Sequence, residues 1–348
     1  MLVQIEGQDL SEPLAFDAPL PVQMVDNLGR VINSLRISVT DRCNFRCTYC
    51  MPEEVDFMQR DLLLSYEEIA RFVRLVVPLG INKLRITGGE PLMRKYLPNL
   101  IRQLNAIDGI NDIAMTTNGF LLKEHAQALK DAGLHRVNVS LDTLVREKFV
   151  EITRRDALQS VLDGIHAADR AGFSPIKINA VAIRGFTEDE IPAFAELTRN
   201  YGHQVRFIEF MPLDADDTWE NQKVLPGREI IERIDAAFPL EAINNSHKEP
   251  ATLYRFKDGI GGDIGIIPSV TEPFCDHCNR IRITSDGKLR TCLFSNRETD
   301  IRSLLRGDAG DEMIARRVVE AVRNKEPGHK INQPDFVKPQ RAMFSIGG

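Results

Sequence analysis

This 348-residue sequence lacks several features, and each absence excludes a class of protein. It has no run of about 18 apolar residues, so we expect no membrane-spanning helix and no membrane partner. It has no excess of basic residues, because its formal charge is −6 and its pI about 5.8, which disfavours a nucleic-acid partner. Residues 1–27 show neither a signal-peptide nor an Arg-rich transit pattern. We therefore expect a flexible N-terminal lead-in and a cytoplasmic protein.

Cysteine is also scarce, and the six cysteines fall into two groups of three. Groups of odd size are poor candidates for disulfides and good candidates for metal binding. The first group has the spacing C-x3-C-x2-C, with Tyr49 just before its last member, and consists of Cys43, Cys47 and Cys50. Three thiolates can hold three irons of a [4Fe-4S] cluster, which leaves the fourth iron open to another ligand. The alternative is a zinc knuckle or a set of free thiols.

The second group consists of Cys275, Cys278 and, after thirteen intervening residues, Cys292. Its spacing leaves two interpretations open, a structural zinc site completed by a histidine or a second iron–sulfur cluster. His277 lies inside the first pair, where it cannot easily turn back to the same metal. Arg280 and Arg282 would share one face of a strand that precedes a hairpin turn at 285–287. Two guanidiniums beside a metal site suit a bidentate grip on a polyanion.

Strand-like and helix-like segments alternate between residues 31 and 210. We expect strands at 31–39, 84–87, 113–117, 137–141, 177–183 and 205–210. We expect helices from the capping box Ser65-x-x-Glu68 to Val77, and at 97–107, 121–132, 157–171 and 188–201. This alternation predicts a parallel sheet with right-handed crossovers, and six units fall short of the eight that close a barrel. The predicted fold class is α/β, an incomplete (βα)6 TIM-like barrel.

Unusual residues follow the carboxyl ends of these strands, where such folds place active sites. After the cysteine octet, these segments are Gly88–Pro91, Thr116–Gly119, Ser140–Asp142 and Glu209–Pro212. Each is weak alone, since a Gly-Gly pair is most often a turn, a strand-end serine is usually satisfied locally, and a methionine is usually core. Their shared position on one rim is what predicts a site.

The first cysteine group and the Gly-Gly-Glu-Pro segment resemble the signature of the radical S-adenosylmethionine superfamily. The resemblance implies an incomplete barrel of the radical S-adenosylmethionine type. It implies that the open iron binds the amino and carboxylate groups of S-adenosylmethionine, whose cleavage releases a 5′-deoxyadenosyl radical. Gly88 and Gly89 would let the backbone approach the methionine part, and Glu90 would pair with its ammonium group.

With the second cysteine group and Arg280-Ile281-Arg282, the chain resembles the GTP 3′,8-cyclases of molybdenum cofactor biosynthesis, over about residues 28–348. The resemblance implies a radical S-adenosylmethionine core at 28–225. It implies a C-terminal region at 226–348 with a second [4Fe-4S] cluster, GTP-binding arginines and a Gly-Gly tail that reaches the active site. The rival interpretations are a radical enzyme that modifies a peptide and a non-catalytic zinc-binding interaction protein.

The implied activity is that of a lyase that converts GTP to (8S)-3′,8-cyclo-7,8-dihydroguanosine 5′-triphosphate. The 5′-deoxyadenosyl radical would take hydrogen from ribose C3′, and the C3′ radical would attack guanine C8. The implied partners are GTP, an electron donor and a downstream cyclic pyranopterin monophosphate synthase. A monomer and a homodimer both remain open.

The resemblance also implies residue roles, motif by motif. The two clusters would be held by Cys43, Cys47 and Cys50, and by Cys275, Cys278 and Cys292. S-adenosylmethionine would contact Tyr49, Gly89, Ser140 and Met211. GTP would contact Arg36, Arg85, Thr116, Lys177, Arg280, Ile281 and Arg282. No residue is assigned as a general base.

The residue pattern itself supports several of these roles. Lys177 and Asn179 share one face of a strand whose other face is apolar, and Arg85 points away from its apolar neighbours. A polar face on a central strand implies a wet barrel interior. Arg206 and Met211 have opposite parity, so both reach that interior only if the chain bends between them.

Overall fold

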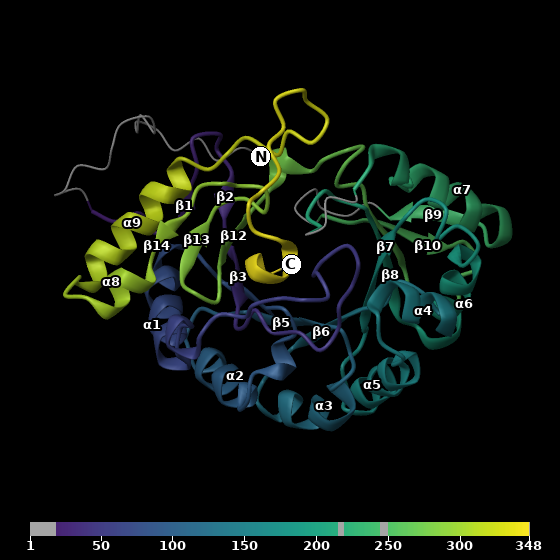
Figure 1. Cartoon of the computed structure of the whole chain (residues 1–348), viewed down its shortest axis with the longest axis horizontal. Coiled ribbons are helices and arrows are strands. Elements are labelled where there is room, and N and C mark those ends of the chain that lie inside the picture. The colour runs from purple at the N-terminus through teal and green to yellow at the C-terminus, as the bar shows by residue number, and fades with distance from the viewer. Residues whose placement is uncertain (1–18, 215–218, 244–249, 348) are drawn as a thin grey trace.

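The computed structural model describes residues 19–214, 219–243 and 250–347, so most of the predicted lead-in and Gly348 lie outside the described residues. A single sheet of twelve strands has the order β14-β13-β12-β3-β4-β5-β6-β7-β8-β11-β10-β9. Its eight central strands, from β12 to β11, all pair in parallel. The sheet curves into an open arc with α1 to α6 along its outer side (Figure 1). The predicted incomplete α/β barrel is confirmed.

The six predicted strands are all present in the first part of the chain. They are β3 (Ser34–Ser38), β4 (Lys83–Thr87), β5 (Asp112–Thr117), β6 (Arg136–Ser140), β7 (Lys177–Ala182) and β8 (Gln204–Glu209). The first expected strand, 31–39, is divided, because β2 (Val31–Ile32) pairs instead with β1 (Met24–Val25) in a separate hairpin.

The five predicted helices are also present, and the capping box at Ser65 and Glu68 is formed. The helices of this region are α1 (Tyr66–Val76), α2 (Leu97–Asn105), α3 (Leu122–Asp131), α4 (Arg146–Thr153), α5 (Leu158–Arg170) and α6 (Ile191–Tyr201). Helix α4 was not predicted, because it has only eight residues and buries only three of them.

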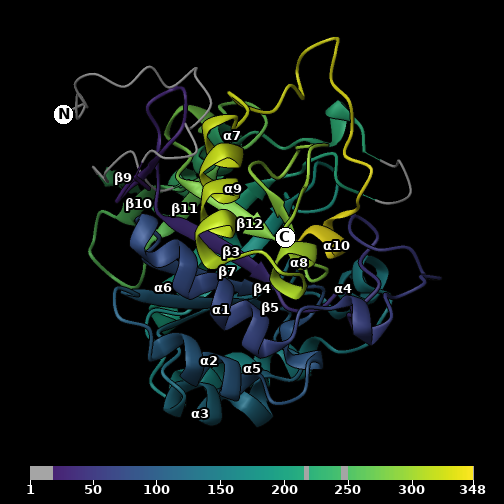
Figure 2. The ribbon, with the colours of Figure 1, turned by 90° about the vertical axis from the view of Figure 1, so that its left-hand side faces the viewer.

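The C-terminal region extends the sheet at both of its edges. At the β8 edge it adds β11 (Ile264–Ile267), β10 (Thr252–Phe256) and β9 (Leu240–Ile243). At the β3 edge it adds β12 (Arg280–Ile283), β13 (Lys288–Arg290) and β14 (Thr299–Asp300), with the predicted hairpin turn between β12 and β13. Its helices are α7 (Gly227–Ala237), α8 (Arg302–Arg306), α9 (Asp311–Arg323) and α10 (Met343–Ile346). Figure 2 shows α9 beside α1, while α10 lies within the arc (Figures 1 and 2).

The apolar core lies between the sheet and its outer helices, and the concave side of the sheet is polar. On β3 and β4, Leu35, Ile37, Leu84 and Ile86 are almost fully buried in this core. The residues between them face the other way, because side chains alternate along a strand. The polar interior therefore follows from the strand pattern. Within the described residues, no helix combines the length and apolarity needed to cross a membrane.

Candidate active site

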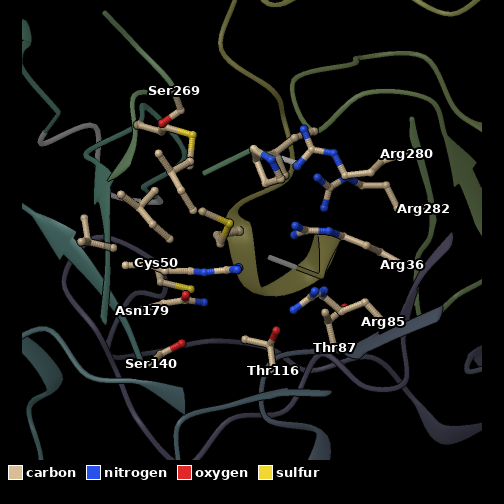
Figure 3. A pocket seen from close by; sticks show the side chains of 18 of the residues that line it. Arg36, Cys50, Arg85, Thr87, Thr116, Ser140, Asn179, Ser269, Arg280 and Arg282 are labelled. Atoms are coloured by element: carbon tan, nitrogen blue, oxygen red, sulfur yellow. The ribbon is translucent and has the colours of Figure 1, made fainter. Parts of the chain in front are cut away.

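A cavity of about 480 Å³ lies on the concave side of the sheet (Figure 3). All six cysteines line it. So do nearly all the residues that the resemblance implied for ligand binding: Tyr49, Gly89, Ser140, Met211, Arg36, Arg85, Thr116, Lys177, Arg280 and Arg282. Residues that are up to about 250 positions apart in the sequence are thus brought to one space by the strands that carry them.

Two of the expected residues do not present their side chains to this cavity. The side chain of Ile281 is fully buried in the hydrophobic core, on the opposite face of β12 from Arg280 and Arg282, so a contact of this residue with GTP would come from its backbone. Glu90 is also buried, and its carboxylate accepts hydrogen bonds from Thr117 Oγ1 at 2.8 Å and from the Asn118 backbone N–H at 2.7 Å. Glu90 therefore stabilises the segment that follows β5, and its carboxylate is not available to pair with a ligand's ammonium group.

The first cysteine triad (Cys43, Cys47 and Cys50) lies on the loop after β3. Tyr49 anchors this loop, since its hydroxyl donates to Asp142 Oδ2 at 2.6 Å, while Asp142 Oδ1 accepts from the Val181 backbone N–H at 2.8 Å. Asn118 Nδ2 approaches Cys43 Sγ at 3.8 Å. The loop is therefore connected by hydrogen bonds to the ends of β5, β6 and β7.

Burial controls the protonation of the first triad. It raises the pKa of Cys43 to about 11, with a further contribution from Glu90, and it raises the pKa of Cys50 to about 12, with a contribution from Cys43. Burial also raises the pKa of Asp142 to about 6. These thiols stay protonated near neutral pH until a metal displaces their protons.

In the second cysteine triad (Cys275, Cys278 and Cys292), burial raises the pKa of Cys275, but Cys278 has the opposite surroundings. Cys275 begins a short 3-10 helix (Cys275–His277), Cys278 follows it directly, and Cys292 comes two residues after β13. Burial alone would raise the pKa of Cys278, but the charges of Arg280 and Lys325 lower it to about 6. This side of the cavity is cationic.

Three guanidiniums, of which Arg282 is buried and Arg36 and Arg85 are half-buried, form a row across adjacent strands. Arg282 of β12 is directly opposite Arg36 of β3, which is opposite Arg85 of β4. Burial and then neighbouring arginines lower the pKa of Arg85 and Arg282 to about 10, and they hold the pKa of Arg36 well below its usual value. Like charges directly opposite each other destabilise a sheet, so this row implies an anionic ligand. Figure 3 shows the row beside Arg280, across the cavity from Ser140, Asn179 and Cys50.

For some other residues, the sequence predicted a place in the cavity only in part. Arg206 and Met211 both line the cavity despite their opposite parity, because β8 ends at Glu209 and Met211 lies beyond it. Asn179 lines the cavity beside its cross-strand neighbour Ser140, and its buried Oδ1 has no hydrogen-bond partner among the described residues. The strand parity shared with Lys177 was its signal.

The C-terminal tail also enters the cavity. The backbone N–H of Phe344 in α10 donates to Cys50 Sγ, and Gly347 O accepts from Arg282 Nη1 at 3.0 Å. Gly347 has a φ of +83°, and a Cβ there would lie only 2.7 Å from Thr87 Oγ1. The tail thus reaches from Cys50 of the first triad to Arg282, and Gly347 fills a space too small for a side chain. Phe344 itself had no signal in the sequence.

The donor sets of both triads fit iron–sulfur clusters. All six cysteines are free thiols that line the cavity. Across the described ranges, no set of three His, Cys, Asp or Glu side chains is arranged to hold a single metal ion. A four-iron cluster takes its thiolates on separate irons, so its ligands need not converge on one point. Three thiols at a site would leave one iron of such a cluster open.

Comparison with known sequences supports both halves of the site. Residues 37–198 match the family described as the Radical SAM superfamily, and residues 203–331 match the family described as Molybdenum Cofactor Synthesis C. The chain is 48% identical over 335 residues to a protein named GTP 3′,8-cyclase from Rhodopirellula baltica, which covers 94% of this chain and 93% of that relative. It is 47% identical over 328 residues to one of the same name from Pelotomaculum thermopropionicum, covering 93% of this chain and all of that relative.

Solved structures share the fold at low sequence identity. Streptococcus suis SuiB bound to S-adenosylmethionine aligns with a TM-score of 0.63 and 14% identity, over 90% of this chain and 77% of that chain. Methylornithine synthase aligns with a TM-score of 0.50 and 13% identity, over 92% of this chain and 81% of that chain. At such identities the likeness concerns the fold alone.

Proposed function

The chain belongs to the family of GTP 3′,8-cyclases, and we propose that its two cysteine triads divide that family's reaction between two sides of one cavity. The protein is a radical S-adenosylmethionine lyase of molybdenum cofactor biosynthesis that converts GTP to (8S)-3′,8-cyclo-7,8-dihydroguanosine 5′-triphosphate. The radical S-adenosylmethionine core occupies residues 28–225, and the GTP side is completed by residues 226–348.

The first triad is the proposed site of the cluster that acts on S-adenosylmethionine. A cluster and S-adenosylmethionine bound here would supply a 5′-deoxyadenosyl radical to take hydrogen from ribose C3′ of GTP. Bond formation between C3′ and guanine C8 would then be completed by one electron from the electron donor and one proton, which gives a dihydro product with the formula of GTP. Tyr49, held by Asp142, would support the cofactor beside the triad. Because Gly89 has no side chain, its backbone would be accessible to the cofactor. Ser140, at the end of β6, and Met211, beyond the end of β8, would complete the contacts.

The second triad would hold another [4Fe-4S] cluster, whose open iron binds the purine of GTP. The row formed by Arg36, Arg85 and Arg282 would bind the triphosphate. Arg280, Thr116 and Lys177 line the same space and would fix the rest of the nucleotide. A polyanion offsets the mutual repulsion of these cations, which otherwise destabilises the folded protein.

The observation that supports this division best is that both triads and the arginine row line a single cavity. A radical formed on one side can then meet GTP held on the other without crossing solvent. Holding reactants in a productive geometry is worth roughly 7–11 kcal/mol of barrier. The chain's main contribution is therefore position, and none of its side chains is assigned as a general base.

The test is anaerobic incubation with GTP deuterated at C3′, S-adenosylmethionine and dithionite. Deuterium should appear in 5′-deoxyadenosine, and the nucleotide product should have the mass of a GTP isomer. A control without S-adenosylmethionine should give neither 5′-deoxyadenosine nor cyclised product. Deuterium-free 5′-deoxyadenosine formed together with product would contradict the proposed hydrogen transfer.

The partners follow from this chemistry as part of the same proposal. An electron donor must reduce the first cluster, and dithionite replaces it in the assay. The product would pass to a cyclic pyranopterin monophosphate synthase in the cytoplasm.

A further inference from the structure

The second triad is assembled from two stretches of chain, residues 275–280 and 291–295, which the hairpin of β12 and β13 connects. Three parts of them are here called its three arms: one around Cys275, one from Cys278 to Arg280, and one from Thr291 to Ser295. The segment after α9, Lys325–His329, contacts all three. Lys325 is only 5% exposed, and its ammonium donates to Arg280 O at 3.0 Å and to Thr291 O. One buried cation therefore ties the second arm to the third.

The neighbouring residue strengthens the contact with the third arm. The carboxylate of Glu326 accepts from Thr291 Oγ1 at 2.6 Å and from Ser295 Oγ. These two residues lie on either side of Cys292. Hydrogen bonds to Glu326 thus hold the third arm on both sides of Cys292.

The first arm is held by an arginine from the other end of the chain. Arg30, in the turn between β1 and β2, donates from Nη1 to Cys275 O at 2.9 Å and to Pro327 O at 2.8 Å, and from Nη2 to Glu326 O at 2.6 Å. Its Nε donates to Asp26 Oδ2 at 2.5 Å, and both side chains are buried. Arg30 therefore connects the first arm to the segment that holds the other two.

The same segment also touches the first cysteine directly. A Cβ at Gly328 would lie 2.9 Å from Cys275 Cβ and 3.0 Å from its Sγ, so only glycine allows this approach. The backbone N–H of His329 donates to Cys275 Sγ. Hydrogen bonds to ligand sulfurs and nearby positive charge are known means of tuning an iron–sulfur cluster.

We propose that Arg30 and Lys325 are positioning residues of the second cluster, which hold the three arms of its cysteine triad at the spacing that the cluster needs. The proposal rests on the proposed function, in which this triad binds a cluster. All three cysteines of the first triad share one octet. The second must bring Cys292, which lies across the hairpin of β12 and β13, to the segment that carries Cys275 and Cys278. Ordering these segments costs conformational entropy that the buried hydrogen bonds offset.

The experiment uses a parent protein in which Cys43, Cys47 and Cys50 are all replaced by alanine, so that any cluster belongs to the second triad. After anaerobic reconstitution, iron release to a chelator is timed and the reduction potential is titrated. Lys325→Met and Arg30→Met should each release iron about tenfold faster, the low end of the usual effect of outer hydrogen-bond partners. Lys325→Met should also make the potential more negative, since a cation is lost.

Lys325→Arg and Arg94→Met are the matched controls. Lys325→Arg keeps a charged donor for both carbonyls and should restore most of the iron retention. Arg94 also ties backbone carbonyls together, those of Val39 and Leu64 at 2.6 Å each, and neither residue belongs to the three arms. Arg94→Met should release iron at the parent rate.

Three outcomes would overturn the inference. Iron release at the parent rate in both Lys325→Met and Arg30→Met would show that the three arms keep their spacing without these two side chains. Equal acceleration by Arg94→Met would show general destabilisation, which melting of the apoproteins would register independently. A parent that binds no iron would overturn the second cluster itself, and the inference with it.

Discussion

The two cysteine triads have the same three ligands, but Cys278 of the second has surroundings opposite to those of Cys43 and Cys50 of the first. Burial raises the pKa of Cys43 to about 11 and of Cys50 to about 12, whereas Arg280 and Lys325 overcome burial and lower that of Cys278 to about 6. The first triad lies near the carboxyl group of Asp142, and the second beside a row of guanidiniums. A positively charged sulfonium cofactor suits the side of the first triad, and a negatively charged triphosphate suits the side of the second. The surrounding charges therefore distinguish the two sites, whereas the number of cysteine ligands is the same at both.

The largest effect is expected from breaking the first triad. Cys47→Ser should lower bound iron by about half and abolish cleavage of S-adenosylmethionine, since a hydroxyl is a poor iron ligand. Iron analysis and chromatography of 5′-deoxyadenosine measure both effects. Undiminished 5′-deoxyadenosine in this variant would remove the functional difference between the triads.

Breaking the second triad should separate two activities. Cys278→Ser should leave the first cluster in place, because the triads lie on different segments, while cyclised nucleotide disappears. Slow, uncoupled formation of 5′-deoxyadenosine should persist. Both products can be quantified in the same reaction by mass spectrometry. Cyclised product at the normal rate would mean that the second site is only structural.

The tail that bridges the two sides should be sensitive to one methyl group. Gly347→Ala places a Cβ 2.7 Å from Thr87 Oγ1 at a φ of +83°, a conformation that costs a non-glycine residue roughly 1–2 kcal/mol. Product formation should fall about tenfold while iron content stays constant. Ser345→Ala is the control, because Ser345 Oγ bonds only within the tail, to Ala342 O, and it should keep full activity.

Removing the last two residues should reduce cyclisation further than Gly347→Ala and affect GTP binding less. Free tail peptide should restore some activity at high concentration, because tethering supplies a high effective concentration. Calorimetry for GTP and product assays separate the two effects. Wild-type turnover after truncation would mean that the tail has no role in the reaction.

The charge difference between the triads can be measured in the apoprotein. Cys278 should be alkylated by iodoacetamide about tenfold faster than Cys43 at pH 7.5, even though a thiolate of low pKa is intrinsically less nucleophilic. A lowered pKa means that the Cys278 rate rises through about pH 6 and is flat above it. The Cys43 rate should still be rising at pH 9, because its pKa is about 11. Peptide mapping identifies which cysteine is alkylated. Equal alkylation rates for Cys278 and Cys43 would contradict the proposed charge difference between the two triads.

The smallest effect concerns the anchor of the first triad. Tyr49→Phe removes the hydrogen bond to Asp142 and should weaken S-adenosylmethionine binding about fivefold. Burial raises the pKa of Asp142 to about 6, so the carboxylate is a full acceptor above that pH and the difference should shrink below it. Tyr66→Phe, which loses a bond to Lys95 O on the outside of the barrel, should bind normally. Equal affinities in all three proteins would mean that the anchor is unimportant.

The sequence by itself determined the repeating part of the fold and the chemistry of the site. Apolar periodicity is local, so strands β3 to β8 and their main helices could be predicted from it. The cysteine spacings predicted two triads, and strand parity predicted the cationic face that carries Arg85, Lys177 and Arg282. The same parity placed Ile281 in the core, although the family motif implied a contact with GTP.

Only the tertiary structure decided what joins distant segments. Strand β11 pairs in parallel with β8 and strand β12 with β3, at the two ends of the run from β3 to β8. Nothing in the local sequence of either strand indicates its parallel partner. Arg30 bonds to Cys275 O across 245 positions and to Pro327 O across 297, so its role could not be found in any sequence window. Glu90 was misassigned for the same reason, because a carboxylate beside a glycine loop points to whichever donors the fold brings near it.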